Sequence, residues 1–299
     1  MKILIYGLNY APEITGIGKY TGELGSWLAS KQHNVKAVSA PPYYPDWKIA
    51  DGVGNWFNKE LIDGVEVHRC PLYVPKNPST LKRLVHLLSF VFSSIFTLTT
   101  LLRWRPDVVV NVVPAIFTSF PAWLYCKATG AKLVIHIQDF ESDAMFGLGM
   151  VKQGVVPKVW AQIEQFMFRR SGLVSSISKS MINNAISKGV KAENTYLLPN
   201  WSELSIFKNV VGTDAFKKRL GLPLDKSIIL YSGNLGRKQG LERMITAAWQ
   251  MRNDSAAHFV ICGTGAAKED LLVMAKLSDL KNLSFISLQA VEDLPGLLA

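Results

Sequence analysis

Glycines and cations gather in the stretch "SGNLGRKQGLERM" at residues 232–244, between an apolar run at 227–231 and a helical pattern that begins near Leu241. Glycines let a loop backbone approach a ligand closely, N–H groups at a helix start favour negative charge, and two cations can neutralise a diphosphate. The stretch therefore indicates a diphosphate site, although a solvent-exposed turn with ordinary surface cations explains the residues about as well. The residues concerned are Gly233, Asn234, Arg237 and Lys238.

A second glycine loop, "PEITGIGKY", follows the first predicted strand and places Gly16 and Gly18 at the start of a helix that runs to about Ser30. A dinucleotide-binding fingerprint would have its glycines directly after the strand and an acidic residue at the end of the second strand. Here the glycines come late and the second strand ends in Ser39-Ala40. This pattern argues against a nicotinamide cofactor and favours a phosphate-bearing substrate held by two glycine loops.

Three carboxylates follow the predicted strand 132–137, and they are Asp139, Glu141 and Asp143. Their spacing of two would place them on one side of an extended chain and could suit a cation. We expect no metal and no cofactor, because the segment is predicted to turn toward a helix and because Arg and Lys can neutralise a diphosphate. Asp139 is the candidate for the reacting centre, with His136 and Gln138 as neighbours; for His136 we expect a structural role in the strand.

The elements that position these residues alternate between short apolar strands and longer helical segments. This alternation predicts an α/β protein with parallel sheets covered on both faces and ligands beyond the carboxyl ends of the strands. A chain of 299 residues exceeds the usual size of one core. We expect two doubly wound domains, 1–199 and 200–299. The predicted strands are 2–7, 35–40, 65–69, 107–113, 132–137 and 173–177 in the first domain and 227–231, 258–262 and 283–286 in the second.

The second predicted domain holds only three strands before the sequence reaches the apolar segment "LPGLLA". Doubly wound halves usually have about five or six strands. We therefore interpret the chain as a C-terminally truncated version of a longer protein.

The formal net charge is +10, of which residues 1–198 contribute +8. Such an excess suits an anionic membrane surface, a phosphorylated substrate or a nucleic acid. We expect no nucleic-acid partner, because no RNA-binding or helix-turn-helix signature is present. The three cysteines lack metal-type spacing and are predicted to be buried thiols, and the N-terminus is interpreted as the first strand of a cytoplasmic protein.

The stretch "LVHLLSFVFSSIFTLTTLL" at 84–102 is uncharged and long enough to span a membrane. A polar stripe and the strand that follows argue instead for a crossover helix. Two hypotheses stay open, a buried helix and a helix whose Leu and Phe face enters the cytoplasmic leaflet. The aromatic loop at 41–57 is interpreted as an acceptor-side lid or as an ordinary loop. The stripe consists of His86, Ser89, Ser93, Thr97 and Thr100.

The stretches "HIQDFESDAMFGLG", "SSISKSM", "LLPNWSE" and "YSGNLGRKQGLE" together resemble the retaining nucleotide-sugar glycosyltransferases of family four, which have the two-Rossmann GT-B fold, and in particular colanic-acid-type exopolysaccharide fucosyltransferases. The resemblance covers the whole chain. It implies metal-free transfer of a sugar from a nucleotide-diphosphate donor, GDP-fucose, to a lipid-linked saccharide at the inner face of the cell membrane. The resemblance implies that the leaving diphosphate helps to take the acceptor proton.

The resemblance also assigns roles to single residues. It places Gly233, Arg237 and Lys238 at the donor diphosphate, and the first-domain loop with Gly16 and Gly18 against the diphosphate and the sugar. In "ICGTG", Gly263 and Gly265 match a loop near the nucleoside, where a plain turn is the alternative.

The sequence departs from the family pattern at two points. Asn234 and Gln239 stand where relatives have Arg and Lys, and the family's pair of glutamates would fall beyond Ala299. A non-catalytic remnant or binding subunit therefore stays as an alternative, and a dinucleotide-dependent oxidoreductase or epimerase is a weaker one.

Overall fold

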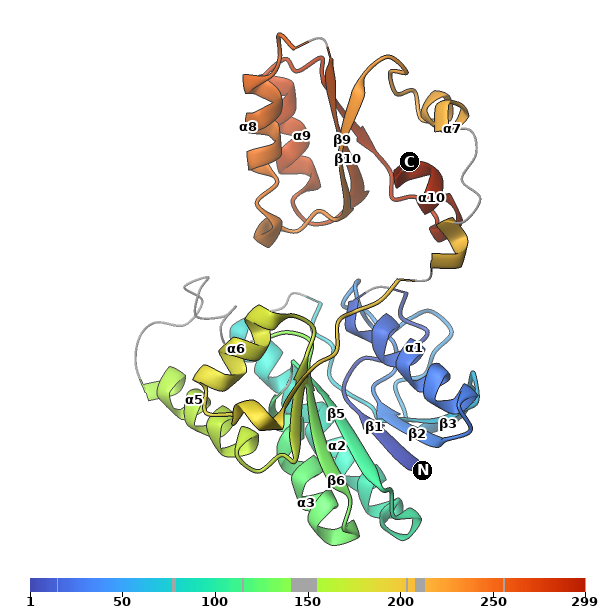
Figure 1. The fold of residues 1–299 in the computed structure, drawn as a ribbon, viewed down its shortest axis with the longest axis vertical. Coiled ribbons are helices and arrows are strands. Elements are labelled where there is room, and N and C mark those ends of the chain that lie inside the picture. Colours follow the sequence, from blue (N-terminus) through green and yellow to red (C-terminus); the bar gives the residue numbers. More distant parts are fainter. Residues whose placement is uncertain are drawn as a thin grey trace. The chain divides into compact units, whose positions relative to one another are not determined.

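The structure is a computed structural model, and it describes residues 1–14, 16–76, 79–114, 116–140, 155–202, 204–207, 213–254 and 256–298. It divides into two compact units (Figure 1), unit 1 from Met1 to Trp201 and unit 2 from Ser202 to Ala299.

An eight-stranded sheet runs through unit 1, in the order β3-β4-β2-β1-β5-β6-β7-β8. All neighbouring strands pair in parallel except β3 and β4. The parallel arrangement confirms the prediction from alternating elements, whereas the edge strands β3 and β8 were not predicted because they carry few buried apolar residues. The strands are β1 (Lys2–Tyr6), β2 (Asn34–Ser39), β3 (Asn58–Ile62), β4 (Val65–Arg69), β5 (Val108–Val113), β6 (Lys132–Ile137), β7 (Leu173–Ser176) and β8 (Thr195–Leu197).

Helices cover both faces of this sheet (Figure 1). Ile3 and Ile5 of β1 belong to a core that includes residues of α1, whereas Leu4 and Tyr6 belong to a larger core with residues of α2, α3 and α5. Because side chains alternate along a strand, α1 and α2 lie on opposite faces. The helices are α1 (Gly16–Ser30), α2 (Thr80–Thr100), α3 (Ser119–Thr129), α5 (Val155–Phe168) and α6 (Lys179–Ser187), with 3-10 turns at Leu102–Trp104, Ile116–Thr118 and Ala192–Asn194.

The long apolar helix α2 packs on the sheet as a crossover between β4 and β5. Two of its polar side chains point inward: the Ser94 hydroxyl lies 2.7 Å from the Tyr6 hydroxyl, and the Thr97 hydroxyl lies 3.1 Å from the Cys70 sulfur. Length and composition alone would allow α2 to span a membrane, and it is the one helix with that property in the described part of the chain. Its contacts with the sheet instead confirm the predicted crossover.

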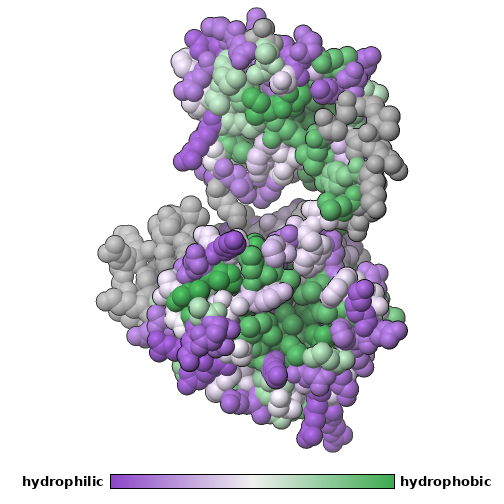
Figure 2. Space-filling view, in the orientation of Figure 1, coloured by the Kyte–Doolittle hydropathy of each residue, from purple (hydrophilic) through white to green (hydrophobic). Residues whose placement is uncertain are grey.

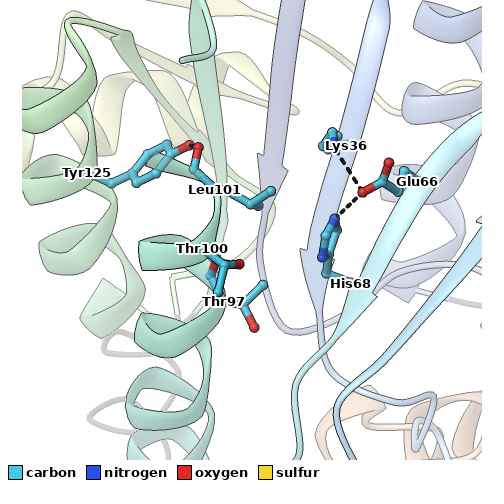
Figure 3. A network of polar contacts seen from close by, with 7 residues as sticks. All are labelled: Lys36, Glu66, His68, Thr97, Thr100, Leu101 and Tyr125. Carbon is cyan, nitrogen blue, oxygen red and sulfur yellow. Dashed lines mark hydrogen bonds and ion pairs between the residues drawn. The ribbon is translucent and has the colours of Figure 1, made fainter. Parts of the chain in front are cut away.

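Hydrogen bonds continue this packing at the end of α2 (Figure 3). The Tyr125 hydroxyl of α3 donates to the Leu101 carbonyl at 2.9 Å and so ties the two helices together. On the neighbouring strands, Lys36 of β2 donates to Glu66 of β4 at 2.8 Å, and His68 lies 2.6 Å from the same carboxylate oxygen.

Apolar residues also reach the surface of unit 1 where β1, β5 and β6 face the viewer (Figure 2).

Three parallel strands in the order β11-β10-β9 form the sheet of unit 2. Leu235, Ile245 and Ile261 are at the centre of its core. Strand β9 is longer than predicted because it continues to pair with β10 as far as Asn234. The elements are α7 (Thr213–Arg219), β9 (Ser227–Asn234), α8 (Glu242–Gln250), β10 (Ala257–Thr264), α9 (Lys268–Leu277), β11 (Leu283–Ile286) and α10 (Leu294–Leu298), with 3-10 turns at Leu204–Phe207, Arg237–Gln239 and Val291–Asp293.

Candidate functional site

A buried carboxylate organises the loop between β1 and α1. Glu13 is 6% exposed and accepts hydrogen bonds from the Asn9 side-chain amide at 2.9 Å and from the backbone N–H groups of Tyr43 and Tyr44 at 3.2 and 3.1 Å. Burial raises the pKa of the Glu13 carboxyl above its usual value, while these donors and Arg69 oppose the shift. Glu13 therefore joins the first glycine loop to the aromatic loop after β2. No local sequence pattern distinguishes Glu13 from a surface glutamate.

The glycines of α1 let the helix lie directly against this loop. A β-carbon on Gly18 would overlap the Glu13 carboxylate, and one on Gly22 would lie 2.6 Å from the Ala11 β-carbon. Gly16 has a φ of 64°, a left-handed conformation that favours glycine. Gly16 and Gly18 were predicted as donor-binding residues, and that role stays a prediction. Independently of any ligand, the packing at Gly18 and the backbone conformation at Gly16 explain why these positions are glycine.

A closed hydrogen-bond network lies at the carboxyl end of β6. The Gln138 amide donates to His136 Nε2 at 2.8 Å and to Asn200 Oδ1 at 3.0 Å, and Asn200 donates back to Gln138 at 3.1 Å. Burial lowers the pKa of His136 to about 4, so the ring is neutral near pH 7. With Nε2 accepting, Nδ1 carries the proton and donates to the Ser175 hydroxyl at 2.9 Å. The ring is thus held in place, which agrees with the structural role expected for His136.

Asp139 follows this network directly and is exposed to solvent. Its predicted role at the reacting centre stays a prediction. Glu141 and Asp143 lie outside the described residues. Within the described ranges, no group of three His, Cys, Asp or Glu side chains could hold a metal ion.

The two glycine loops of unit 2 lie side by side at the carboxyl edge of its sheet. Gly233 and Gly263 are paired across β9 and β10, and a β-carbon on Gly263 would overlap the Gly233 carbonyl oxygen. The Leu235 N–H donates to the Thr264 carbonyl at 2.8 Å, and a β-carbon on Gly265 would lie 2.6 Å from the Leu235 carbonyl oxygen. The structure therefore brings together the loops predicted to bind the diphosphate and the nucleoside.

Arg237 opens the 3-10 turn that follows this pair of loops, and Asn234, the last residue of β9, is exposed. The Arg237 guanidinium lies 3.1 Å from the Asp270 carboxylate of α9, and both side chains are largely exposed. Exposed ion pairs of this kind contribute about 0–1 kcal/mol, so an anionic ligand could displace Asp270. The Lys238 side chain lies outside the described part of the structure. Asp270 was not predicted as a site residue, because it stands at a helix start far along the chain and no local pattern links it to Arg237.

Comparisons with known proteins agree with this arrangement. The family "Glycosyl transferase 4-like domain" matches residues 15–201, and "Glycosyl transferases group 1" matches residues 212–299. A relative in Escherichia coli strain K12, described as the colanic acid biosynthesis glycosyl transferase WcaI, is 50% identical over 100% of this chain and 74% of its own length.

Solved structures show the same fold. HepE of Anabaena in complex with UDP has a TM-score of 0.66 at 15% identity, covering 100% of this chain and 71% of HepE. WaaG, a glycosyltransferase involved in lipopolysaccharide biosynthesis, has a TM-score of 0.63 at 13% identity, covering 99% and 72%. The fold is therefore that of the GT-B glycosyltransferases, which confirms the predicted fold class.

The chain belongs to the glycosyl transferase 4-like family, and with residues 212–299 matching the glycosyl transferases of group 1 it is a glycosyltransferase. This confirms the predicted family and transferase class, and the comparisons do not favour the oxidoreductase or remnant alternatives. The donor sugar, the stereochemistry and the acceptor stay predictions.

The contact between α1 and its loop can be tested with Gly22→Ala. Alanine normally stabilises a helix interior, but here its β-carbon would crowd Ala11, and overpacking costs about 1–3 kcal/mol. We expect the free energy of unfolding, measured in urea, to fall by about 1–2 kcal/mol. The control is Gly54→Ala, because nothing lies within 4 Å of a β-carbon there. Equal stability of Gly22→Ala and the wild type would contradict the packing.

The buried His136 should make stability depend on pH. The pKa falls from 6.5 in the unfolded chain to about 4 in the folded protein, so the unfolded state binds more protons between these values. Stability is then lost as the pH falls from about 6.5 to about 4, by on the order of 3 kcal/mol. His136→Gln should reduce this loss. The measurement is the free energy of unfolding at pH values between about 7.5 and about 4.5, a range in which the unfolded-state histidine becomes protonated. Parallel curves for both proteins over that range would show that His136 does not titrate as described.

Proposed function

We propose that this glycosyltransferase moves fucose from GDP-fucose, with retention of configuration, onto a lipid-linked saccharide during exopolysaccharide biosynthesis. The observation that supports it best is the 50% identity, over the whole chain, to a glycosyl transferase of colanic acid biosynthesis. HepE supports a sugar-nucleotide donor in general, because its structures hold UDP and UDP-glucose and its fold is shared with this chain.

In the proposed reaction, unit 2 binds the donor and unit 1 binds the acceptor. The bond between the anomeric carbon and the diphosphate oxygen breaks, and the acceptor hydroxyl forms a new bond on the same face of the sugar. The leaving diphosphate takes the hydroxyl proton. Arg237, Lys238 and the loop around Gly233 stabilise the negative charge that develops on the diphosphate, and this kind of electrostatic stabilisation is usually the largest catalytic contribution.

The remaining predicted residues complete the proposed site. Gly263 and Gly265 bring a second loop beside Asn234 for the nucleoside. The loop with Gly16 and Gly18 approaches the diphosphate and the sugar, and Asp139 contacts the reacting sugar or the acceptor. Neither a metal nor a cofactor takes part.

We also propose that unit 1 lies on the inner face of the cell membrane, where a lipid-linked acceptor would be found. The charge of +8 on residues 1–198 supports contact with anionic lipids. Exposed Phe side chains on α2 support contact with the acyl region of the bilayer.

Donor titration by calorimetry tests the diphosphate assignment. We expect Arg237→Ala to weaken GDP-fucose binding about tenfold, since charge-assisted hydrogen bonds contribute roughly 1.5–3 kcal/mol. Asp270→Asn should strengthen binding about two- to threefold, because it removes the carboxylate that competes for Arg237. Arg252→Ala is the matched control, an exposed arginine of the same unit that stacks on Trp249.

Three outcomes would contradict parts of this proposal. Unchanged affinity in both Arg237→Ala and Lys238→Ala would remove the diphosphate assignment. Tighter binding of NAD than of any sugar nucleotide would favour the dinucleotide-dependent enzyme. Preference for UDP-sugars over GDP-sugars would replace the nucleoside and leave the reaction class intact, and the anomeric coupling constant of the product by NMR decides between retention and inversion.

A further inference from the structure

The outer face of α2 is apolar, although this face of the helix points away from the sheet. Phe92 is 71% exposed and Phe96 is 61% exposed, while Ser94 and Thr97 are buried on the opposite side of the helix. A helix on the surface of a water-soluble domain normally has the opposite arrangement. The Phe57 ring, from the end of the aromatic loop, packs against Phe96 at a centroid distance of 5.4 Å and extends the apolar surface.

A groove of about 260 Å³ lies between the C-terminal half of α2 and helix α3. Its volume is smaller than that of the pockets of about 300–1,000 Å³ that hold whole small molecules. Its walls are almost entirely hydrocarbon and could accept one alkyl chain. The principal lining residues are Ile95, Leu98, Leu102, Phe120 and Leu124.

A second hollow, of about 330 Å³, lies on the other side of the last turns of α3. Three cations line it, Lys127, Lys132 and Arg170, and Trp123 forms an aromatic wall. The Arg170 guanidinium stacks over the Phe166 ring at 3.5 Å, which holds this charge at the surface beside apolar groups. The groove and the hollow thus lie on two sides of α3, and they border each other where Leu124 and Lys127, three residues apart, are neighbours on the helix surface.

The stretch of sequence that contains α2 and α3 is strongly basic. Between residues 67 and 138 the sequence has eight Lys or Arg residues, of which Lys127 and Lys132 line the hollow, and a single acidic residue, Asp107. The Asp107 carboxylate already accepts a hydrogen bond from the Lys2 backbone N–H at 2.7 Å. Lys127 and Lys132 are exposed and form no ion pair with the described carboxylates.

We infer that this surface binds an anionic phospholipid, with one acyl chain in the groove between α2 and α3 and the phosphate among Lys127, Lys132 and Arg170. Charge complementarity selects an anionic lipid over a second copy of this chain, because a symmetric contact through the same face would bring like charges together. Lys132 begins β6, so the site lies at the amino edge of the sheet and apart from Asp139. The inference deepens the membrane association proposed above and does not involve the donor loops.

Vesicle sedimentation tests the headgroup site. With phosphatidylcholine vesicles that contain phosphatidylglycerol, we expect Lys127→Ala/Lys132→Ala to lower the partition coefficient about fivefold per cation removed. Binding to vesicles of phosphatidylcholine alone should be weak and unaffected by this change. The matched control is Lys31→Ala. Lys31 is an exposed lysine directly after α1, and its ammonium group lies over the Trp27 ring. Equal partition of the double variant and the control would overturn the inference.

A nitroxide label tests the chain site independently of charge. Attached at Thr99→Cys in the groove, it should become accessible to oxygen and protected from a water-soluble nickel reagent when anionic vesicles are added. A label at Leu61→Cys, on the exposed edge strand β3, should stay accessible to nickel. Equal nickel access at both positions would overturn the inference, as would self-association without lipid that Leu124→Glu abolishes.

Calorimetry with GDP-fucose separates this inference from the proposed function. Lys127→Ala/Lys132→Ala should bind the donor as the wild type does. If the wild type binds the donor but not anionic vesicles, the lipid site is wrong and the transferase proposal stands. If the wild type binds anionic vesicles but not the donor, the donor proposal is wrong and the lipid site stands.

Discussion

Close approach of backbone segments at the carboxyl ends of the strands is the constraint on which the candidate site depends. In unit 1, α1 begins directly against the buried Glu13 because Gly18 has no side chain. In unit 2, the loops after β9 and β10 touch at Gly233 and Gly263, where a β-carbon would overlap a carbonyl oxygen. Close packing thus requires glycine at both sheet edges, whether or not a ligand binds there. The same open backbone is what a diphosphate would need in order to approach N–H groups.

Buried polar groups connect this edge to the rest of unit 1. Glu13 accepts hydrogen bonds from the aromatic loop, and Gln138 links His136 to Asn200 near the end of the unit. Glu13 and His136 would be costly to bury without a partner, so these bonds hold the loops in one arrangement. The quoted stretch "LLPNWSE" therefore has a structural reason at Asn200, which closes the network at the carboxyl end of β6.

Helix α2 shows how one element can meet two different environments. Ser94 and Thr97 bond to groups in and next to the sheet and Phe90 packs in the core, while Phe92 and Phe96 remain on the outside. Burying these hydroxyl groups is tolerated because each one has a partner. The outer face keeps apolar area that water does not favour, and a lipid surface would remove this cost.

Alternating apolar runs and glycine loops were enough to predict the α/β fold, most strands and the residues of the two unit 2 loops, because hydrophobic periodicity and turn chemistry are local properties of a sequence. The edge strands β3 and β8 escaped because they bury little. Contacts between distant residues could not be read from local patterns: Glu13 with Tyr43, Arg237 with Asp270, and Ser94 of α2 with Tyr6. Only the tertiary structure decided these, since burial and pairing depend on which elements the fold places side by side.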